Sequence, residues 1–225
     1  MSCMRNHSLI VCKDHMKPTH PTTDSYPTFE YCALRYLLLW EQKEREISQK
    51  MREKVPQREA LRTALHYFRV ARNFPGLAKD DCADRVLKAV TEVGASDCES
   101  SEKVDQLVCR FNKDFGGKNL SAATKLLWLR FRRPFVIYDA RTVAALSCQH
   151  DFNKSKYAEY EAAWRDSYKV HRHEIDHAVQ CLPSLHPFFT QWHLTPNSMD
   201  RLIKHQWFRE RVFDIYLWER GGKAD

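Results

Sequence analysis

The segment that decides the fold is residues 121–146, which reads SAATKLLWLRFRRPFVIYDARTVAAL. Its first part is apolar on nearly every side, which predicts a buried central helix from about Asn119 to Phe131. Pro134 disfavours helix in the residue before it, so we expect an extended connector over residues 132–138. Asp139 is a preferred residue type at a helix start and stands just before a second apolar stretch. The segment therefore predicts two helices joined by an extended, apolar connector.

Helical periodicity also dominates the rest of the chain. Apolar residues recur at intervals of three and four positions, whereas no stretch alternates as a half-buried strand does. Six glycines are few for a sheet-rich fold with many tight turns. We therefore predict an all-α protein. Its other helices are expected over residues 29–40 with an exposed continuation at 41–54, 61–68, 82–93 with Gly94 as a C-terminal cap, 100–111, 157–182 and 196–218.

The composition is that of a globular protein. The chain has 225 residues, of which 43% are hydrophobic and 29% charged. Residues 1–26, rich in His, Pro, Thr and Lys, predict a loosely ordered arm, followed by a single helical domain at residues 27–225. No apolar run approaches the roughly 18–20 residues of a membrane span, and charges occupy the region where a signal peptide is apolar. We expect a cytoplasmic protein without membrane contact.

The eight cysteines are scattered along the chain and include no C-x-x-C pair. Without an export signal, such cysteines are expected to be reduced thiols rather than disulfides. Their wide spacing also argues against an iron–sulfur cluster, which needs closely grouped thiolates. We predict no metal ion and no other cofactor.

A net charge of +7 and a pI near 9.0 favour an anionic partner, with nucleic acid as the first candidate. Basic residues gather around the central segment, where they would contact DNA phosphates; an ordinary solvated basic face is the alternative. These residues are Lys118, Lys125, Arg130, Arg132, Arg133 and Arg141.

Lys125 and Asp139 are the candidate reactive residues of the central segment. Burial on the apolar helix would lower the pKa of Lys125 toward the neutral amine that a nucleophile needs. A carboxylate at a helix start is stabilised in its ionised form. Such a carboxylate can stabilise an oxocarbenium-like sugar or activate an attacking nucleophile. The simpler alternatives are a plain helix cap for Asp139 and a lysine that reaches solvent or a phosphate.

The Thr124-Lys125 pair, the apolar run after it and Asp139 at a helix start resemble the core of the helix-hairpin-helix DNA glycosylase superfamily. The segment is most similar to the 8-oxoguanine DNA glycosylase branch and its small prokaryotic relatives, with a weaker likeness at residues 207–218. The resemblance implies two packed helical lobes with a cleft between them and a catalytic core at about residues 118–150. It also implies that Lys125 is the nucleophile and Asp139 the catalytic aspartate.

Two departures from the family pattern concern the central segment. The family's hairpin usually places a Gly-x-Gly turn directly before the Thr-Lys pair, whereas Gly116-Gly117 lies further upstream here. The spacing from Lys125 to Asp139 is also shorter than usual. These departures leave the phosphate contact and the Schiff-base role of Lys125 open, and they make Asp139 the firmer assignment.

The resemblance implies a monomeric DNA glycosylase that binds double-stranded DNA and flips a damaged or modified base. It would cleave the N-glycosidic bond of that base and leave an abasic site. The base would be oxidised guanine in a repair role, or a hypermodified base of viral DNA in antiviral defence. A non-catalytic DNA-binding protein is the alternative. Aromatic candidates for the base pocket, which core packing would equally explain, are Trp128, Tyr138 and Trp207.

A rival pattern, H-E-x-x-H, occurs at His173, Glu174 and His177 and is typical of zinc peptidases. An apolar stripe from Tyr157 to Ala178 would face the core and place both histidines on the opposite, solvent side of the same helix. No third ligand follows at metzincin spacing. A chance match among eleven histidines is the favoured interpretation.

Overall fold

The computed structural model describes residues 27–188 and 194–222, and every regular element in these ranges is helical. The predicted all-α class is confirmed. The arm expected at residues 1–26 lies outside the described residues. None of the helices in these ranges combines the length and the apolar composition of a membrane span.

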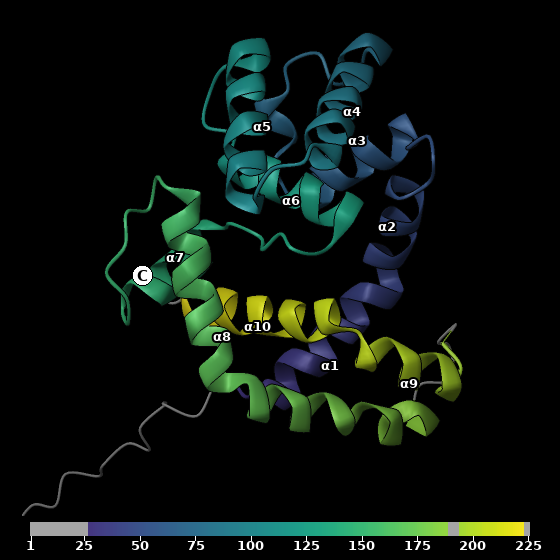
Figure 1. The fold of residues 1–225 in the computed structure, drawn as a ribbon. Helices are drawn as coiled ribbons and strands as arrows, with labels where there is room; N and C mark the ends of the chain where they lie inside the picture. The colour runs from purple at the N-terminus through teal and green to yellow at the C-terminus, as the bar shows by residue number, and fades with distance from the viewer. Residues whose placement is uncertain (1–26, 189–193, 223–225) are drawn as a thin grey trace, which may run out of the picture.

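The described chain consists of α-helices with one π-helical turn and two 3₁₀ segments (Figure 1). In chain order the elements are α1 (Phe29–Leu39), the π turn (Trp40–Glu44), α2 (Arg45–Met51), α3 (Arg58–Tyr67), a 3₁₀ turn (Ala71–Asn73), α4 (Asp80–Ala95), α5 (Ser100–Phe115), α6 (Leu120–Phe131), α7 (Ala140–Ser147), α8 (Tyr157–Gln180), a 3₁₀ segment (Leu182–Phe188), α9 (Pro196–Lys204) and α10 (Gln206–Arg220).

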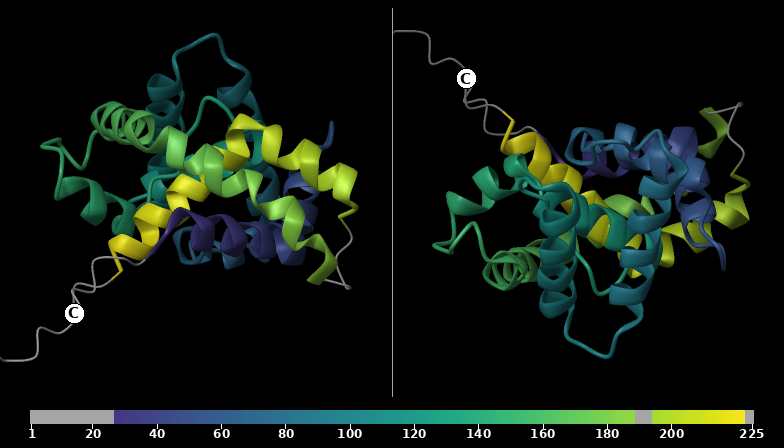
Figure 2. Two further views of the ribbon diagram at one scale, coloured as in Figure 1. Left: turned by 90° about the horizontal axis from the view of Figure 1, so that it is seen from below. Right: turned by 90° about the horizontal axis from the view of Figure 1, so that it is seen from above.

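The helices gather into two groups. Helices α2 to α6 pack on one another in the upper part of the view, and α1 packs with α7 to α10 below them (Figure 1). Helix α10 contacts α1, α7, α8 and α9, and it stays beside α1 in the views from below and above (Figure 2). The two groups are joined by the run from α1 into α2, by the connector between α6 and α7, and by contact of α5 with α8.

Helix α6 is buried, as its sequence predicts. Every residue from Ala122 to Leu129 is buried, and the helix packs against α2, α4 and α5. The connector after it is non-helical, also as predicted. Two tyrosines of α8 hold this connector. The Tyr157 hydroxyl bonds to both backbone groups of Val136 at 3.0 and 3.1 Å, and the Tyr160 hydroxyl donates to the carbonyl of Ile137 at 2.6 Å. These bonds fix the backbone that leads into α7.

One predicted helix end and one predicted continuous helix are wrong. Gly94 lies within α4, which continues to Ala95. A Cβ on Gly94 would lie 1.9 Å from Cε2 of Phe131, so glycine at this position lets α6 approach α4 closely. The single helix expected over residues 196–218 is two helices, because His205 has an extended ψ of 128° and interrupts the helical backbone between α9 and α10.

Candidate functional site

The structure brings Lys125 and Asp139 together. The Lys125 Nζ atom lies 2.9 Å from Oδ2 of Asp139 and 2.9 Å from Oγ of Ser121, one turn earlier on α6. The Lys125 side chain is 6% exposed and that of Asp139 is 25% exposed. The pair therefore combines a buried amine with a carboxylate that solvent can reach.

Hydrogen bonds on both sides hold this pair in place. The Asp139 Oδ1 atom accepts from the Arg141 amide at 3.1 Å, which confirms the predicted cap of α7 and leaves Oδ2 for Lys125. The Thr124 hydroxyl accepts from the Tyr138 amide at 3.1 Å and thereby ties α6 to the residue before Asp139. The two residues of the Thr-Lys pair therefore have different contacts. Thr124 binds the connector, and Lys125 binds the carboxylate of Asp139.

The surroundings of Lys125 lower its pKa from the ordinary lysine value. Burial lowers the pKa of the Lys125 ammonium, and the Asp139 carboxylate partly offsets this by favouring the charged form. The ring of Phe68 lies 5.8 Å from Nζ and supplies part of the apolar cover. A buried amine with a lowered pKa beside one carboxylate is an arrangement suited to nucleophilic attack and proton transfer.

A buried group of charges lies near this pair and was missed by sequence reasoning. Arg211 Nη2 donates to Oε1 of Glu44 at 3.0 Å, and Arg211 Nη1 lies 3.7 Å from Oδ2 of Asp214. The Trp164 indole donates to Oδ1 of Asp214 at 2.8 Å. Burial raises the pKa of Asp214 to about 7. The only sequence signal was that Asp214 stands between Phe213 and Ile215, inside an apolar stretch.

Arg132 is placed differently from the prediction of a phosphate contact. It is 4% exposed, and its guanidinium carbon lies 4.0 Å from the ring of Trp128, 4.2 Å from that of Trp207 and 5.1 Å from that of Trp40. Nη2 donates to the Ser48 hydroxyl, whereas Nε and Nη1 have no hydrogen-bond partner within the described ranges. The aromatic faces cover the arginine, so it is not exposed as a phosphate contact would require in this structure, and that contact stays a prediction.

The other basic candidates divide between internal and exposed roles. Arg130 turns inward and donates to the carbonyls of Met51 and Glu53 at the end of α2. Lys118, Arg133 and Arg141 are exposed and remain candidates for phosphate contact.

The three aromatic candidates do not line a common base pocket. Trp128 is 2% exposed and packs in the core, and its predicted role in a base pocket stays a prediction. Trp207 is partly buried and packs edge-on against Trp128, with ring centroids 6.5 Å apart. Tyr138 packs on Tyr160 of α8, and its hydroxyl donates to the Lys154 carbonyl at 2.8 Å.

The H-E-x-x-H residues lie on the solvent side of α8, as the apolar stripe predicts. His173, Glu174 and His177 are exposed and border a small pocket together with Glu30. His177 Nδ1 and Glu30 Oε1 are 4.0 Å apart. Within residues 27–188 and 194–222, no three His, Cys, Asp or Glu side chains are arranged to hold a metal ion.

Comparison of the chain with models of known protein families, with curated proteins and with solved structures finds no match.

Proposed function

We propose that the protein is a DNA glycosylase that removes a damaged or modified base and leaves an abasic site. The main support is the 2.9 Å contact between a buried lysine amine and a helix-capping carboxylate, Lys125 and Asp139. These residues also carry the resemblance to the helix-hairpin-helix glycosylases. In this proposal the protein acts as a monomer in the cytoplasm on double-stranded DNA. The base is oxidised guanine or a hypermodified base of viral DNA.

The chemistry assigns one task to each partner. As the C1′–N bond breaks, the base leaves with the bonding electrons, and the Asp139 carboxylate stabilises the positive charge that develops on the sugar. If the neutral amine of Lys125 attacks C1′, Asp139 accepts the proton that the new C–N bond releases from nitrogen. The C1′–O4′ bond then breaks, O4′ takes up the second proton of the nitrogen, and the opened sugar is left as a Schiff base. If water attacks instead, Asp139 accepts a proton from that water, and Lys125 serves to position the carboxylate.

The turn between α5 and α6 supports a place for DNA in this proposal. Gly116 and Gly117 have φ values of +72° and +79°, a backbone conformation that favours glycine. The turn leads through the exposed Lys118 into the first turn of α6, where backbone amides lack partners within the helix. We assign a phosphate contact to this turn and treat the two helix groups as lobes, with the cleft for DNA beside Asp139.

The decisive experiment measures base release from a panel of duplexes that contain oxidised guanine, hydroxymethylated cytosine or glucosylated cytosine, scored as alkali-labile sites. We expect one of these substrates to be cleaved, and Asp139→Asn to slow its cleavage by about a thousandfold. Asparagine also caps helices, so the fold and the DNA affinity should persist. Asp166→Asn removes an exposed carboxylate of α8 and should leave the rate unchanged.

The same experiment separates the alternatives. Full activity of Asp139→Asn would overturn the assignment. Salt-sensitive DNA binding with no alkali-labile site on any substrate would instead support a non-catalytic DNA-binding protein. A covalent complex that is trapped by borohydride and is lost in Lys125→Ala would establish the lysine as the nucleophile.

A further inference from the structure

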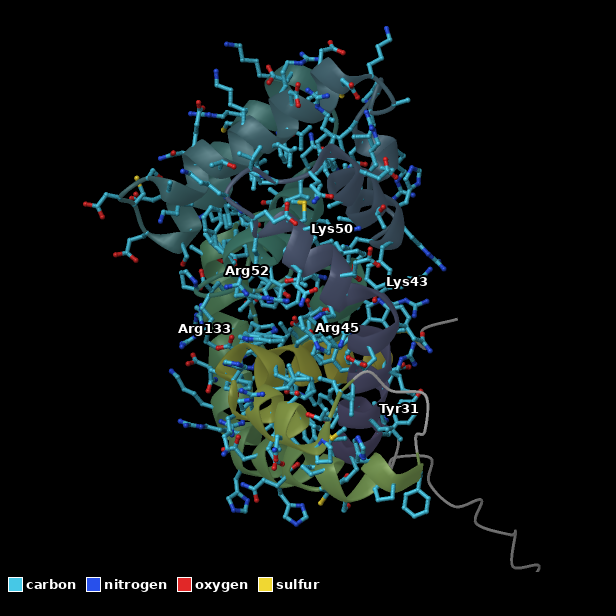
Figure 3. The ribbon with its side chains drawn as sticks, turned by 90° about the vertical axis from the view of Figure 1, so that its right-hand side faces the viewer. Tyr31, Lys43, Arg45, Lys50, Arg52 and Arg133 are labelled. Atoms are coloured by element: carbon cyan, nitrogen blue, oxygen red, sulfur yellow. The ribbon has the colours of Figure 1, made fainter. Side chains whose placement is uncertain are left out.

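A second site lies at the other end of α6, away from Asp139. A cavity of about 790 Å³ opens between α2, the end of α6, α9 and the start of α10. This volume is within the range of small-molecule sites. Figure 3 shows the face concerned, with Arg45, Arg52 and Arg133 close together on it. Neither Lys125 nor Asp139 lines the cavity.

The lining of this cavity is strongly basic. Five arginines and one histidine contribute to it, and none of the described residues that line it is acidic. Two of the arginines have an acidic neighbour, since Arg45 lies 3.1 Å from Glu41 and Arg133 lies 3.4 Å from Glu210. The full basic set is Arg45, Arg52, Arg132, Arg133, Arg201 and His205. Such a concentration of positive charge selects an anionic ligand.

Arg52 and Arg201 provide uncompensated charge at the rim. Both are exposed, and neither forms an ion pair with any part of the chain that the structure describes. They come from different elements, since Arg52 follows α2 and Arg201 belongs to α9. An anion between them would therefore be held from two sides.

The floor of the cavity supplies an independent indication of a ligand. Arg132 lines it, and this arginine is 96% buried while two of its guanidinium nitrogens lack an acceptor in the described structure. A buried cation without an anion is costly, and the aromatic faces around it compensate only in part. An anionic ligand in the cavity would offset the positive charge of Arg132.

The remaining lining is aromatic and suits a planar ring. Trp40, Phe131 and Trp207 contribute to the walls, and bases stack readily on such side chains. We propose that this cavity binds a nucleotide, with its base against Trp207 and Trp40 and its phosphate between Arg52 and Arg201. The nucleotide is either free in solution or an unpaired unit of a DNA strand. This proposal does not depend on the chemistry assigned to Lys125 and Asp139.

Binding measurements on the full chain test the proposal and separate the two sources. Calorimetry with deoxyadenosine monophosphate and anisotropy with a labelled single-stranded oligonucleotide provide the two arms. Arg52→Gln/Arg201→Gln should weaken binding of whichever probe the wild type binds by about tenfold or more. Lys88→Gln/Lys113→Gln, which removes two exposed charges from α4 and α5, should bind as the wild type does.

Each outcome has a definite meaning. Binding of the mononucleotide alone assigns the cavity to a free nucleotide. Binding of the oligonucleotide, with competition by the mononucleotide, assigns it to an unpaired nucleotide of DNA. Deoxyadenosine should bind more weakly than its phosphate in either case. The proposal is overturned if neither probe binds, or if the arginine and lysine double variants bind equally well. Retention of binding by Asp139→Asn would show that this site is distinct from the base-release chemistry.

Discussion

Lys125 and Arg132 are both buried cations associated with α6, but their surroundings differ. Lys125 lies on the helix and faces a carboxylate at 2.9 Å, whereas Arg132 follows the helix and is covered by three indole rings. A lysine can lose its proton, and burial lowers its pKa toward that event. An arginine stays charged, so its burial leaves a demand for an anion. The first environment is suited to proton transfer and the second to binding.

The aromatic cover of Arg132 predicts the largest effect on stability. Arg132→Ala removes a side chain that is 4% exposed and leaves a gap among the indole rings. We expect the free energy of unfolding to fall by about 3 kcal/mol, as for other large buried side chains cut back to alanine. Urea unfolding measures this loss. Arg172→Ala, on the exposed face of α8, should change stability by less than about 0.5 kcal/mol.

Arg132→Lys tests whether the flat shape of the guanidinium or its charge provides this stability. Lysine keeps the charge but lacks a planar face for the indole rings, so we expect it to recover only a minor part of the lost stability. A lysine variant as stable as the wild type would contradict the role assigned to stacking.

The same two cations show how far the sequence can predict the site. The burial of Lys125 follows from apolar neighbours on every side of a short helix, and the cap formed by Asp139 follows from its residue type and position. The burial of Arg132 does not follow, because arginines are usually exposed. Two of the rings that cover it, Trp40 and Trp207, come from distant parts of the chain.

Glu44 illustrates a second limit. Its place in a charged run predicts an exposed residue, yet it is buried at the end of the π turn. A period of 3.6 residues places Glu44 on the buried face, four positions after Trp40 and seven after Leu37. The charged composition of the run, rather than its period, therefore led to the wrong expectation. The sequence therefore predicted most of the helices and singled out Lys125 and Asp139, which the structure places in contact, but it did not predict the tertiary contacts that bury charges.

Asp214 predicts a pH effect that links the two cations, since the buried charges around Arg211 act on both Lys125 and Arg132. Its pKa is raised from 3.8 to about 7 by burial. Between these two pH values the folded protein binds a proton that the unfolded chain has released, so stability falls as the pH rises.

Unfolding at pH 5 and pH 7 measures this dependence. We expect the free energy of unfolding of the wild type to fall by on the order of 2 kcal/mol from pH 5 to pH 7. That of Asp214→Asn should fall much less, because its amide does not titrate. Asp166→Asn, which changes an exposed carboxylate, should retain the wild-type slope. Equal slopes for Asp214→Asn and the wild type would show that Asp214 is ionised throughout the interval and is held by Arg211.

The smallest effect concerns the proton of Lys125, and it rests on the proposed function. On DNA with a preformed abasic site, only the neutral amine forms a Schiff base, so cyanoborohydride trapping should rise with pH and level off below the ordinary lysine pKa of 10.5. Asp139→Asn removes the nearby anion that favours the ammonium, so the midpoint should fall.

Lys125→Ala should abolish trapping, and Asp166→Asn should keep the wild-type midpoint. An unchanged midpoint in Asp139→Asn would contradict the assignment of Asp139 as the group that holds the lysine proton. Arg132 offers a direct contrast, since its guanidinium does not deprotonate in this range. A change in the trapping midpoint in Asp139→Asn would therefore place the proton transfer at Lys125. The end of α6 next to Arg132 would then serve ligand binding.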